Sequence, residues 1–368
     1  VYTVSGQDRV QVQTLTGVTV ENVHSLTETE INSLLSEGMS LSVYDISHNR
    51  VDYVWTLADD GQTSFTNYHY NEDGDLAYTV SGADRSSVEG LSGVTVDTVA
   101  SLTEDDIDSL LASGMSIAVY DPVNGRIDHV WARNDSGEAS FTQYFYDSIG
   151  KLVFTASADT RTQIENLTGV TVDNAANLSD ADIDTVLESG MSLAIYDTVN
   201  NRVDHVWSRD DSGKATFTKY HYNSYGELSF TVTGANRATV ERLTEITVDN
   251  VHQLTQGDIA TYLSGSMSVA VYDTAENHIS HVWALDNSGE VTYTGYFYDE
   301  NNNVAYTISG SNASAVEGIS GITLQNVSEL TQAEIDSFLA NEMSLAVYDT
   351  DNNRVDHIWA KDDQGDVT

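Results

Sequence analysis

The chain repeats itself every 76 residues. Tryptophan and methionine each occur once per repeat, and no insertion or deletion breaks the register between the first and the last of them. These markers are Trp55, Trp131, Trp207, Trp283 and Trp359, with Met39, Met115, Met191, Met267 and Met343. A fixed period of this length predicts a tandem array in which neighbouring repeats stabilise one another. Five near-copies favour a function in reach, spacing or multivalent contact over a single catalytic pocket.

The composition is strongly acidic. The 368 residues include 57 Asp and Glu against 15 Lys and Arg, which gives a net charge of −42, and every repeat is acidic. Nucleic acid and an anionic membrane surface both require a basic footprint, so neither is an expected partner. A field of this sign attracts cations and keeps a long chain soluble.

Several features indicate the cell exterior. Lysine is rare, Asp, Ser and Thr are abundant, and no cysteine is present. The lack of cysteine excludes disulfide and thiolate–metal architectures. No apolar run reaches the ~18 residues of a membrane span. We therefore expect an extracellular or cell-surface protein, of prokaryotic type, with no membrane insertion in this segment.

The second repeat serves as the template for local structure. Residues 85–91 are predicted to form a short helix, and Val94–Val96 a brief extended piece. A second helix is predicted to begin after Thr103, because Asp106 three residues later completes a capping box. The same capping pair recurs as Thr27/Glu30, Ser179/Asp182, Thr255/Asp258 and Thr331/Glu334.

After Met115 the hydrophobic period changes from helical to strand-like. The predicted strands cover residues 116–120, 126–132, 139–146 and 152–157. Turn residues separate them, and short loops force neighbouring strands to run antiparallel. Asn302 replaces the turn glycine Gly150 in the fourth repeat, which predicts a positive φ angle at this position.

We predict an α+β fold in which five 76-residue units, each of two short helices plus a four-stranded antiparallel β-meander, stack as a linear rod or superhelix. Residues 1–6 would be the last strand of a preceding unit. The repeats would span residues 7–82, 83–158, 159–234, 235–310 and 311–368, the last of them incomplete. Because both ends fall inside strand-like segments, we expect the chain to be a piece of a longer protein.

Acidic turns are the candidate metal sites, because oxygen-rich loops suit a hard cation such as calcium. The candidate ligands are Asp59, Asp60, Asp210, Asp211, Asp349, Asp351, Asp362 and Asp363. For the second turn of each repeat a solvated loop is favoured over calcium binding. An aspartate also ends the first strand of each repeat, at Asp45, Asp121, Asp197, Asp273 and Asp349. Here a turn cap is favoured over a calcium ligand. Calcium is the one cofactor that the sequence suggests.

Two aromatic patterns could form contacts. The first is His-Val-Trp in the second strand, as at His129 and Trp131, which could act as a metal or sugar site or as packing against the helices. Packing is favoured, because Tyr53 replaces the histidine in the first repeat. The second is a tyrosine stripe on the third strand, comprising Tyr68, Tyr70, Tyr144, Tyr146, Tyr220, Tyr222, Tyr296 and Tyr298. Such rows could bind glycan or another subunit if exposed, but cross-strand packing is favoured.

No common enzymatic motif is present, whether G-x-S-x-G, H-E-x-x-H, a P-loop or G-x-G-x-x-G. Adjacent Asp and His residues such as Asp128 and His129 are expected to point to opposite faces of a strand. They would then form no catalytic dyad. The sequence therefore does not indicate an enzyme.

The third turn, Tyr-x-Tyr-Asp-x-x-Gly-x-Leu at Tyr144–Leu152, resembles the tyrosine-aspartate repeats of large bacterial secreted proteins. The helical half and the 76-residue period do not match that pattern. We interpret the likeness as a shared hairpin solution and not as family membership.

Together these patterns predict a structural repeat protein of the cell surface or extracellular space, acting as an adhesin stalk, a filament or a surface-layer element. Its expected partners are copies of itself or adjoining repeats of a longer chain. The alternative is a multivalent carbohydrate-binding module that uses the tyrosine and tryptophan stripes.

Overall fold

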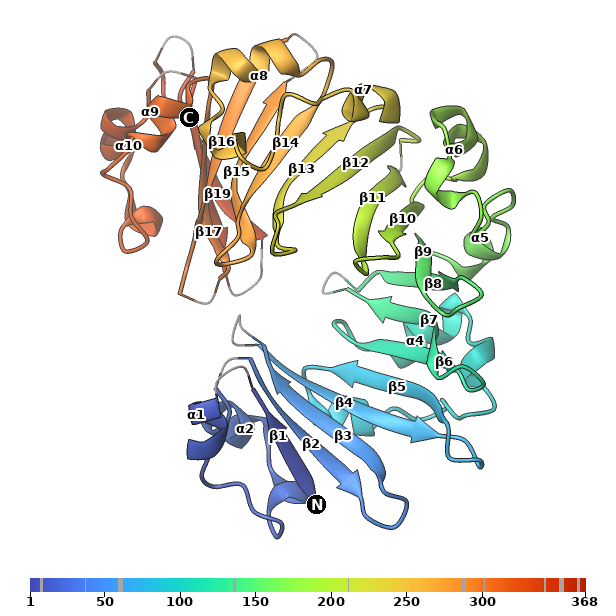
Figure 1. Cartoon of the computed structure of the whole chain (residues 1–368). Helices are drawn as coiled ribbons and strands as arrows, with labels where there is room; N and C mark the ends of the chain where they lie inside the picture. The colour runs from blue at the N-terminus through green and yellow to red at the C-terminus, as the bar shows by residue number, and fades with distance from the viewer. Residues whose placement is uncertain are drawn as a thin grey trace. The chain divides into compact units, whose positions relative to one another are not determined.

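The computed structural model describes residues 1–6, 9–36, 38–58, 62–134, 137–210, 212–285, 289–300, 302–340, 342–350, 354–362 and 365–368. Strands dominate them, and their order along the chain is given in Figure 1. The strands are β1 (Tyr2–Ser5), β2 (Met39–Asp45), β3 (Arg50–Leu57), β4 (Thr63–Tyr70), β5 (Leu76–Gly82), β6 (Ser116–Asp121), β7 (Arg126–Arg133), β8 (Ala139–Tyr146), β9 (Leu152–Ala158), β10 (Ser192–Asp197), β11 (Arg202–Arg209), β12 (Ala215–Tyr222), β13 (Leu228–Gly234), β14 (Ser268–Asp273), β15 (His278–Leu285), β16 (Val291–Tyr298), β17 (Val304–Gly310), β18 (Ser344–Asp349) and β19 (Arg354–Ala360).

The helices are short. The α-helices are α1 (Arg9–Thr14), α2 (Glu28–Leu34), α3 (Arg85–Glu89), α4 (Glu104–Leu110), α5 (Arg161–Glu165), α6 (Asp180–Val186), α7 (Arg237–Glu241), α8 (Gln256–Tyr262), α9 (Ala313–Glu317) and α10 (Gln332–Phe338). Five 3-10 helices are also described: Val23–Ser25, Val99–Ser101, Ala175–Asn177, Val251–Gln253 and Val327–Glu329. Helices of five to seven residues are too short to be stable in isolation, so packing against the sheet must hold them.

Local sequence signals explain where these elements begin and end. The Thr103 capping box is confirmed, since Asp106 N donates to the Thr103 hydroxyl and the Asp106 carboxylate accepts from Thr103 N at 2.9 Å. The positive φ predicted for Asn302 is also confirmed, at 62°. The extended piece predicted at Val94–Val96 is wrong. There Thr95 N donates to Thr98 Oγ1, and this local bond turns the chain into the 3-10 helix that begins at Val99.

The strands form one antiparallel sheet of 19 strands. Within each repeat, successive strands are joined by hairpins. The last strand of one repeat also pairs with the first strand of the next, as in β5–β6, β13–β14 and β17–β18. The same register shift recurs in the third strand, between His69 and Tyr70, Phe145 and Tyr146, His221 and Tyr222, and Phe297 and Tyr298.

The predicted fold class of five separate α+β units, each with two helices and its own four-stranded meander, is therefore wrong. The helices and strands occur close to where the sequence predicts them, but the protein is mostly β and the meanders join into a single sheet. The physical reason is that a meander standing alone would leave two edge strands with unpaired N–H and C=O groups. Pairing β5 with β6 satisfies those groups across the predicted boundary near residue 82.

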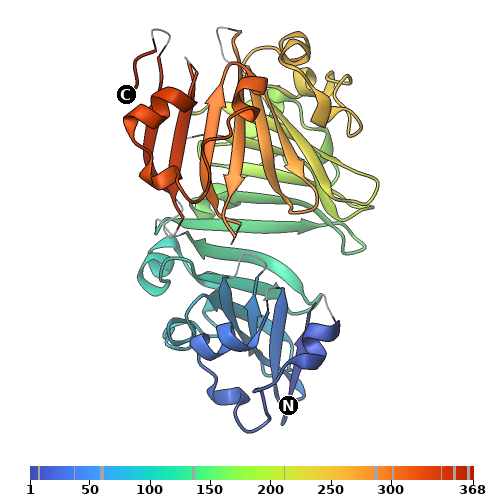
Figure 2. The same cartoon turned by 90° about the vertical axis from the view of Figure 1, so that its left-hand side faces the viewer.

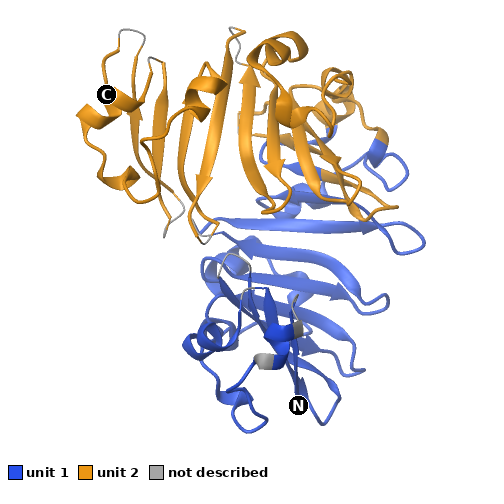
Figure 3. Cartoon of the chain, turned by 60° about the vertical axis from the view of Figure 1, so that its left-hand side comes forward, with its two compact units in different colours: residues 1–176, 186–193 blue, residues 177–185, 194–368 orange. Residues whose placement is uncertain are grey.

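The chain divides into two compact units, shown in different colours in Figure 3. Unit 1 comprises residues 1–176 and 186–193, and unit 2 comprises residues 177–185 and 194–368. Each unit has the same two-layer plan, in which helices cover one face of the strands. Figures 1 and 2 show this arrangement, for example where α5 lies beside β8 and β9.

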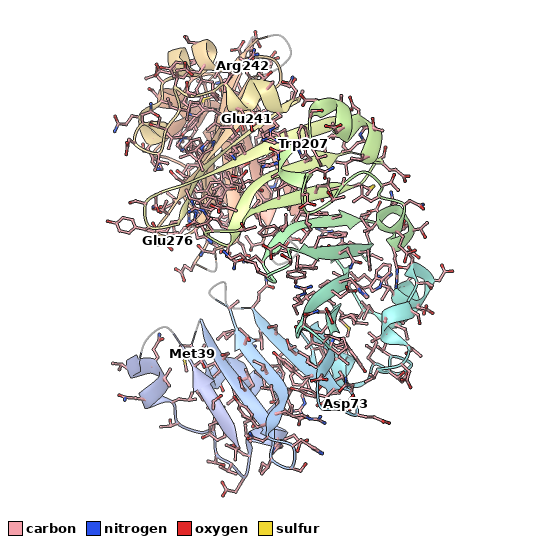
Figure 4. All side chains as sticks on the ribbon, turned by 45° about the vertical axis from the view of Figure 1, so that its right-hand side comes forward. Met39, Asp73, Trp207, Glu241, Arg242 and Glu276 are labelled. Atoms are coloured by element: carbon pink, nitrogen blue, oxygen red, sulfur yellow. The ribbon has the colours of Figure 1, made fainter. Side chains whose placement is uncertain are left out.

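The core lies between the helices and the covered face of the sheet. Four of the tryptophans are almost completely buried there: Trp55, Trp131, Trp207 and Trp283. Trp207, labelled in Figure 4, packs against Phe217 with ring centroids 4.7 Å apart. From the helices, the buried residues Ile107 and Leu111 complete this layer in the second repeat. The aromatic residues at alternate positions of β7 and β8, Trp131 and Phe141, thus face the helices.

The continuity of the sheet can be tested at Ala118 in β6, which has a neighbouring strand on both sides. We expect Ala118→Pro to lower the free energy of unfolding by roughly 2–3 kcal/mol, because proline removes a ladder donor from an interior strand. Amide hydrogen exchange should accelerate in both β5 and β6. Ala118→Ser, which keeps the N–H, is the control. Accelerated exchange confined to the 83–158 repeat would contradict pairing across the boundary.

Candidate functional site

The acidic turns were the predicted metal sites. Asp59, Asp60, Asp211, Asp351 and Asp363 lie outside the described residues. The three described members of the set are engaged within their own turns. Asp210 accepts from Ser212 Oγ at 2.6 Å and from Lys214 N at 2.8 Å, Asp362 accepts from Asp366 N at 2.8 Å, and Asp349 lies 3.5 Å from Arg354 Nε.

No group of three or more acidic or histidine side chains that could hold a metal ion is found in the described parts of the chain. The aspartates that end the first strand of each repeat cap turns there. Asp121 accepts from Val123 N at 2.9 Å, and Asp197 accepts from Val199 N at 2.9 Å. Hydrogen bonds from the Asn124 side chain and from the backbone amides of Val123 and Asn124 lower the pKa of Asp121. Calcium binding by the turns stays a prediction.

The His-Val-Trp pattern packs in the core, as favoured from the sequence. The exposed fraction is 2% for His129 and 1% for His205. His129 and Trp131 both contact Phe141, with ring centroids 5.2 and 4.7 Å apart. Buried tryptophans cannot stack on a sugar, so these tryptophans do not support the carbohydrate-binding alternative.

The expectation that Asp128 and His129 point to opposite faces is wrong. Asp128 Oδ2 lies 2.8 Å from His129 Nδ1, and the equivalent atoms of Asp204 and His205 lie 2.7 Å apart. A β-bulge explains the geometry. Pairing with β6 skips Asp128, so this residue leaves the regular alternation and turns toward its neighbour. A strand pattern read with strict period two cannot reveal such a pair.

The third repeat adds a cation to this pair. Lys219 Nζ lies 2.7 Å from both carboxylate oxygens of Asp204. The hydrogen bond from His205, followed by that from Lys219, holds the pKa of Asp204 well below its usual range. Nearby, burial lowers the pKa of His221 to about 4, so this imidazole is neutral at physiological pH.

The buried histidines leave one polar atom without a protein partner among the described residues. This atom is Nε2 of His129 and of His205. In the first repeat Tyr53 takes the same position, and its hydroxyl reaches the carbonyl oxygen of Val23 at 3.1 Å. The tyrosine hydroxyl therefore forms a hydrogen bond at a buried position where Nε2 of the shorter histidine ring forms none among the described residues.

The tyrosine stripe is largely engaged within the sheet. The second tyrosine of each pair donates its hydroxyl to a backbone carbonyl of the preceding, directly paired strand. The acceptors are the carbonyl oxygens of Val51, Ile127, Val203 and Ile279. A guanidinium covers the ring in three repeats, as with Arg50 at 4.3 Å from the Tyr70 centroid. The first tyrosine of each pair is half-buried, and burial raises the pKa of Tyr68, Tyr220 and Tyr296.

The face of the sheet turned away from the helices forms a surface that we call the hydroxyl face. It is defined by one row of directly opposed residues in each unit. In unit 1 the row crosses β1–β8 and comprises Thr3, Ser42, Val54, Thr66, Ser81, Ser116, Ala132 and Ser140. In unit 2 it crosses β12–β19 and comprises Tyr220, Thr231, Ala270, Val282, Thr294, Ser309, Ser344 and Ala360. None of these residues is charged, in a protein of net charge −42.

The hydroxyl face was not predicted from the sequence, although a signal for it is present. Each strand alternates large apolar residues with Ser, Thr, Ala or Val, as in Ser116-Ile-Ala-Val. Only the cross-strand register shows that the small residues of eight strands fall into one row. The tyrosines of the predicted stripe flank this face, since Tyr68 lies opposite Thr79 and Tyr144 lies opposite Thr155.

Comparison with known proteins gives matches only among solved structures. No protein-family model matches the chain, and no curated protein matches it in sequence. Among solved structures, the chain is similar to "TcdB2-TccC3-TEV", with 10% identity, a TM-score of 0.16, and coverage of 88% of this chain and 19% of that one. It is also similar to TcdB2-TccC3 without its hypervariable C-terminal region, with 12% identity, a TM-score of 0.17, and coverage of 98% and 20%. The chain spans about a fifth of those chains, and these scores carry neither fold nor function over to it.

The role of the buried histidine can be tested by exchanging residues between repeats. We expect His129→Tyr to change the free energy of unfolding by less than about 1 kcal/mol, because the new hydroxyl satisfies a buried position while the hydrogen bond to Asp128 is lost. The reverse change in the first repeat, Tyr53→His, should lower it by about 1 kcal/mol, because the bond to Val23 is lost. Urea denaturation measures both. Equal destabilisation by the two changes would contradict this account.

The Asp204 cluster predicts a pH-dependent contribution to stability. A carboxylate whose pKa is lowered by folding stabilises the fold above its unfolded pKa, and the contribution fades as pH falls through the folded pKa. Asp204→Asn should therefore cost about 1 kcal/mol at pH 7 after screening by solvent, with a smaller deficit below about pH 4. Asp128→Asn, whose carboxylate faces Gln143 where Asp204 faces Lys219, should cost less. A deficit for Asp204→Asn that does not change between pH 7 and pH 3 would count against the role of this carboxylate.

Proposed function

We propose that this chain is a structural segment of a prokaryotic cell-surface or extracellular protein, where it serves as an adhesin stalk, a filament or a surface-layer element. One observation carries the proposal. The same strand pairing and the same register shift recur in successive repeats, at His69/Tyr70, Phe145/Tyr146, His221/Tyr222 and Phe297/Tyr298. Side chains vary between repeats while the backbone plan does not, which is what a spacing element requires.

Composition supports an exterior location. The chain is acidic, poor in lysine and without cysteine. Within the described residues the longest helices have seven residues, and none has the length and apolar character needed to cross a bilayer. We propose copies of the same chain, or adjoining repeats, as partners.

The carbohydrate-binding alternative has less support. Four tryptophans are buried, and the second tyrosine of each stripe pair uses its hydroxyl within the sheet. The aromatic groups that this function would use are thus mostly committed to packing.

Protease treatment of intact cells that produce the protein tests its location. We expect proteinase added to intact cells to degrade the chain while a cytoplasmic marker stays whole. Cells lysed before treatment provide the control for intrinsic protease sensitivity. Protection of the chain until lysis would overturn the proposed function, because a stalk or surface-layer element must be reachable from outside.

A further inference from the structure

We propose that the hydroxyl face is the surface at which a second copy of this chain docks, with one sheet face against the other. This inference deepens the proposed function, on which it rests, by naming the contact surface and the partner. Both units carry the same kind of row, so the proposal applies to each unit by itself.

Charge is unevenly distributed over the surface. Most acidic residues lie in helices, in turns and at strand ends, as with Glu104, Asp105 and Asp121, whereas strand aspartates such as Asp128 and Asp204 lie at the bulged positions. Figure 4 labels three further examples, Asp73 and Glu276 in turns and Glu241 in α7. The rows of the hydroxyl face carry no charge. Two chains of net charge −42 can therefore approach through this face without bringing carboxylates into opposition.

The polar groups of the face are largely paired already. Within its rows, hydroxyls pair across strands at 2.9 Å for Thr66 and Ser81 and at 2.8 Å for Thr294 and Ser309. Beside the rows, Thr142 pairs with Ser157 at 2.8 Å and Thr218 with Thr233 at 2.9 Å. The backbone beneath them is paired in the ladder. Covering the face would therefore leave few hydrogen-bond donors or acceptors without a partner. The free-energy cost of desolvating the face is low for this reason.

Short side chains make up most of the face. Apart from the row-end tyrosines Tyr68 and Tyr220, its residues are Ser, Thr, Ala and Val, so two such faces can come close together. In unit 1 a second uncharged row runs beside the first and comprises Tyr68, Thr79, Ala118, Val130, Thr142 and Ser157. With strands ~4.8 Å apart and rows ~6.8 Å apart, the eight residues of the first row and the six of the second cover roughly 450 Å² of each partner. The total of roughly 900 Å² is the size of a weak, transient interface.

The composition of the face favours a second copy over a glycan. Depletion of charge together with half-buried tyrosines such as Tyr68 is typical of the centre of a protein interface. The two rows of unit 1 offer no Asn, Gln, Asp or Arg side chain for directed hydrogen bonds to a sugar. A self-complementary contact also places the same uncharged surface on both partners.

Salt should strengthen this contact. Screening of the repulsion between two acidic chains favours association, whereas binding of an uncharged polysaccharide would change little with salt. We therefore expect sedimentation velocity of the full 368-residue chain to show an increasing dimer fraction between about 10 and 500 mM NaCl, where the Debye length falls steeply. The samples should contain EDTA, which excludes bridging by calcium.

Charge placed on the face tests it directly. The double variant Ser116→Glu with Ser344→Glu adds one carboxylate to the face in each unit, and we expect the dissociation constant to rise at least tenfold. The matched control, Val123→Glu with Val199→Glu, adds the same charge at exposed turns, and it should change the dissociation constant less than twofold. Equal effects of the two pairs, or a monomer at every salt and protein concentration, would overturn the proposal.

Crosslinking gives a second readout that does not depend on a destabilising charge. The natural chain has no cysteine, so Ser116→Cys and Val123→Cys each introduce a single thiol. We expect disulfide-linked dimers to form faster through Cys at position 116. Faster crosslinking at position 123 would overturn the proposal. A different result would also overturn it: the protein pellets with an insoluble uncharged polysaccharide, and Ser116→Glu abolishes this binding without changing the oligomeric state. The measurements use purified protein, so they can fail independently of the test on intact cells.

Discussion

The structure depends on the pairing between the last strand of one repeat and the first strand of the next. In unit 1 this is β5 with β6, and in unit 2 it is β13 with β14 and β17 with β18. Each repeat would otherwise leave two strand edges unpaired. Its helices, of five to seven residues, are too short to supply a stable layer alone. The sheet therefore supports the helices, and the repeats depend on their neighbours for stability.

This arrangement gives the sheet two different faces. Tryptophan, phenylalanine and long aliphatic residues occupy the covered face, with Trp131 and Phe141 as one example of close aromatic packing. The hydroxyl face carries short uncharged residues although the chain as a whole has a net charge of −42. In most soluble sheets the solvated face carries charges that keep copies apart. Here most charges lie on the helices, turns and strand ends, and the rows of the hydroxyl face carry none.

Irregularities in the strands decide details that a regular pattern hides. The bulge in β7 turns Asp128 toward His129, and the equivalent bulge lets Asp204 meet both His205 and Lys219. Strict alternation predicts that the side chains of these neighbours point to opposite faces of the strand, and the bulges make that prediction wrong. Capping boxes and turn residues were predicted correctly, because their partners lie within four residues along the chain.

The sequence by itself determined the 76-residue period, the capped helices, the strand positions and the residues with positive φ, because each of these follows from contacts between residues close in the chain. The tertiary structure alone decided that the meanders join into one sheet of 19 strands. It also decided that Thr66, Ser81 and Ser116 stand in one row. Those outcomes depend on hydrogen bonds between residues that are distant in the chain, and a single sequence does not specify their register.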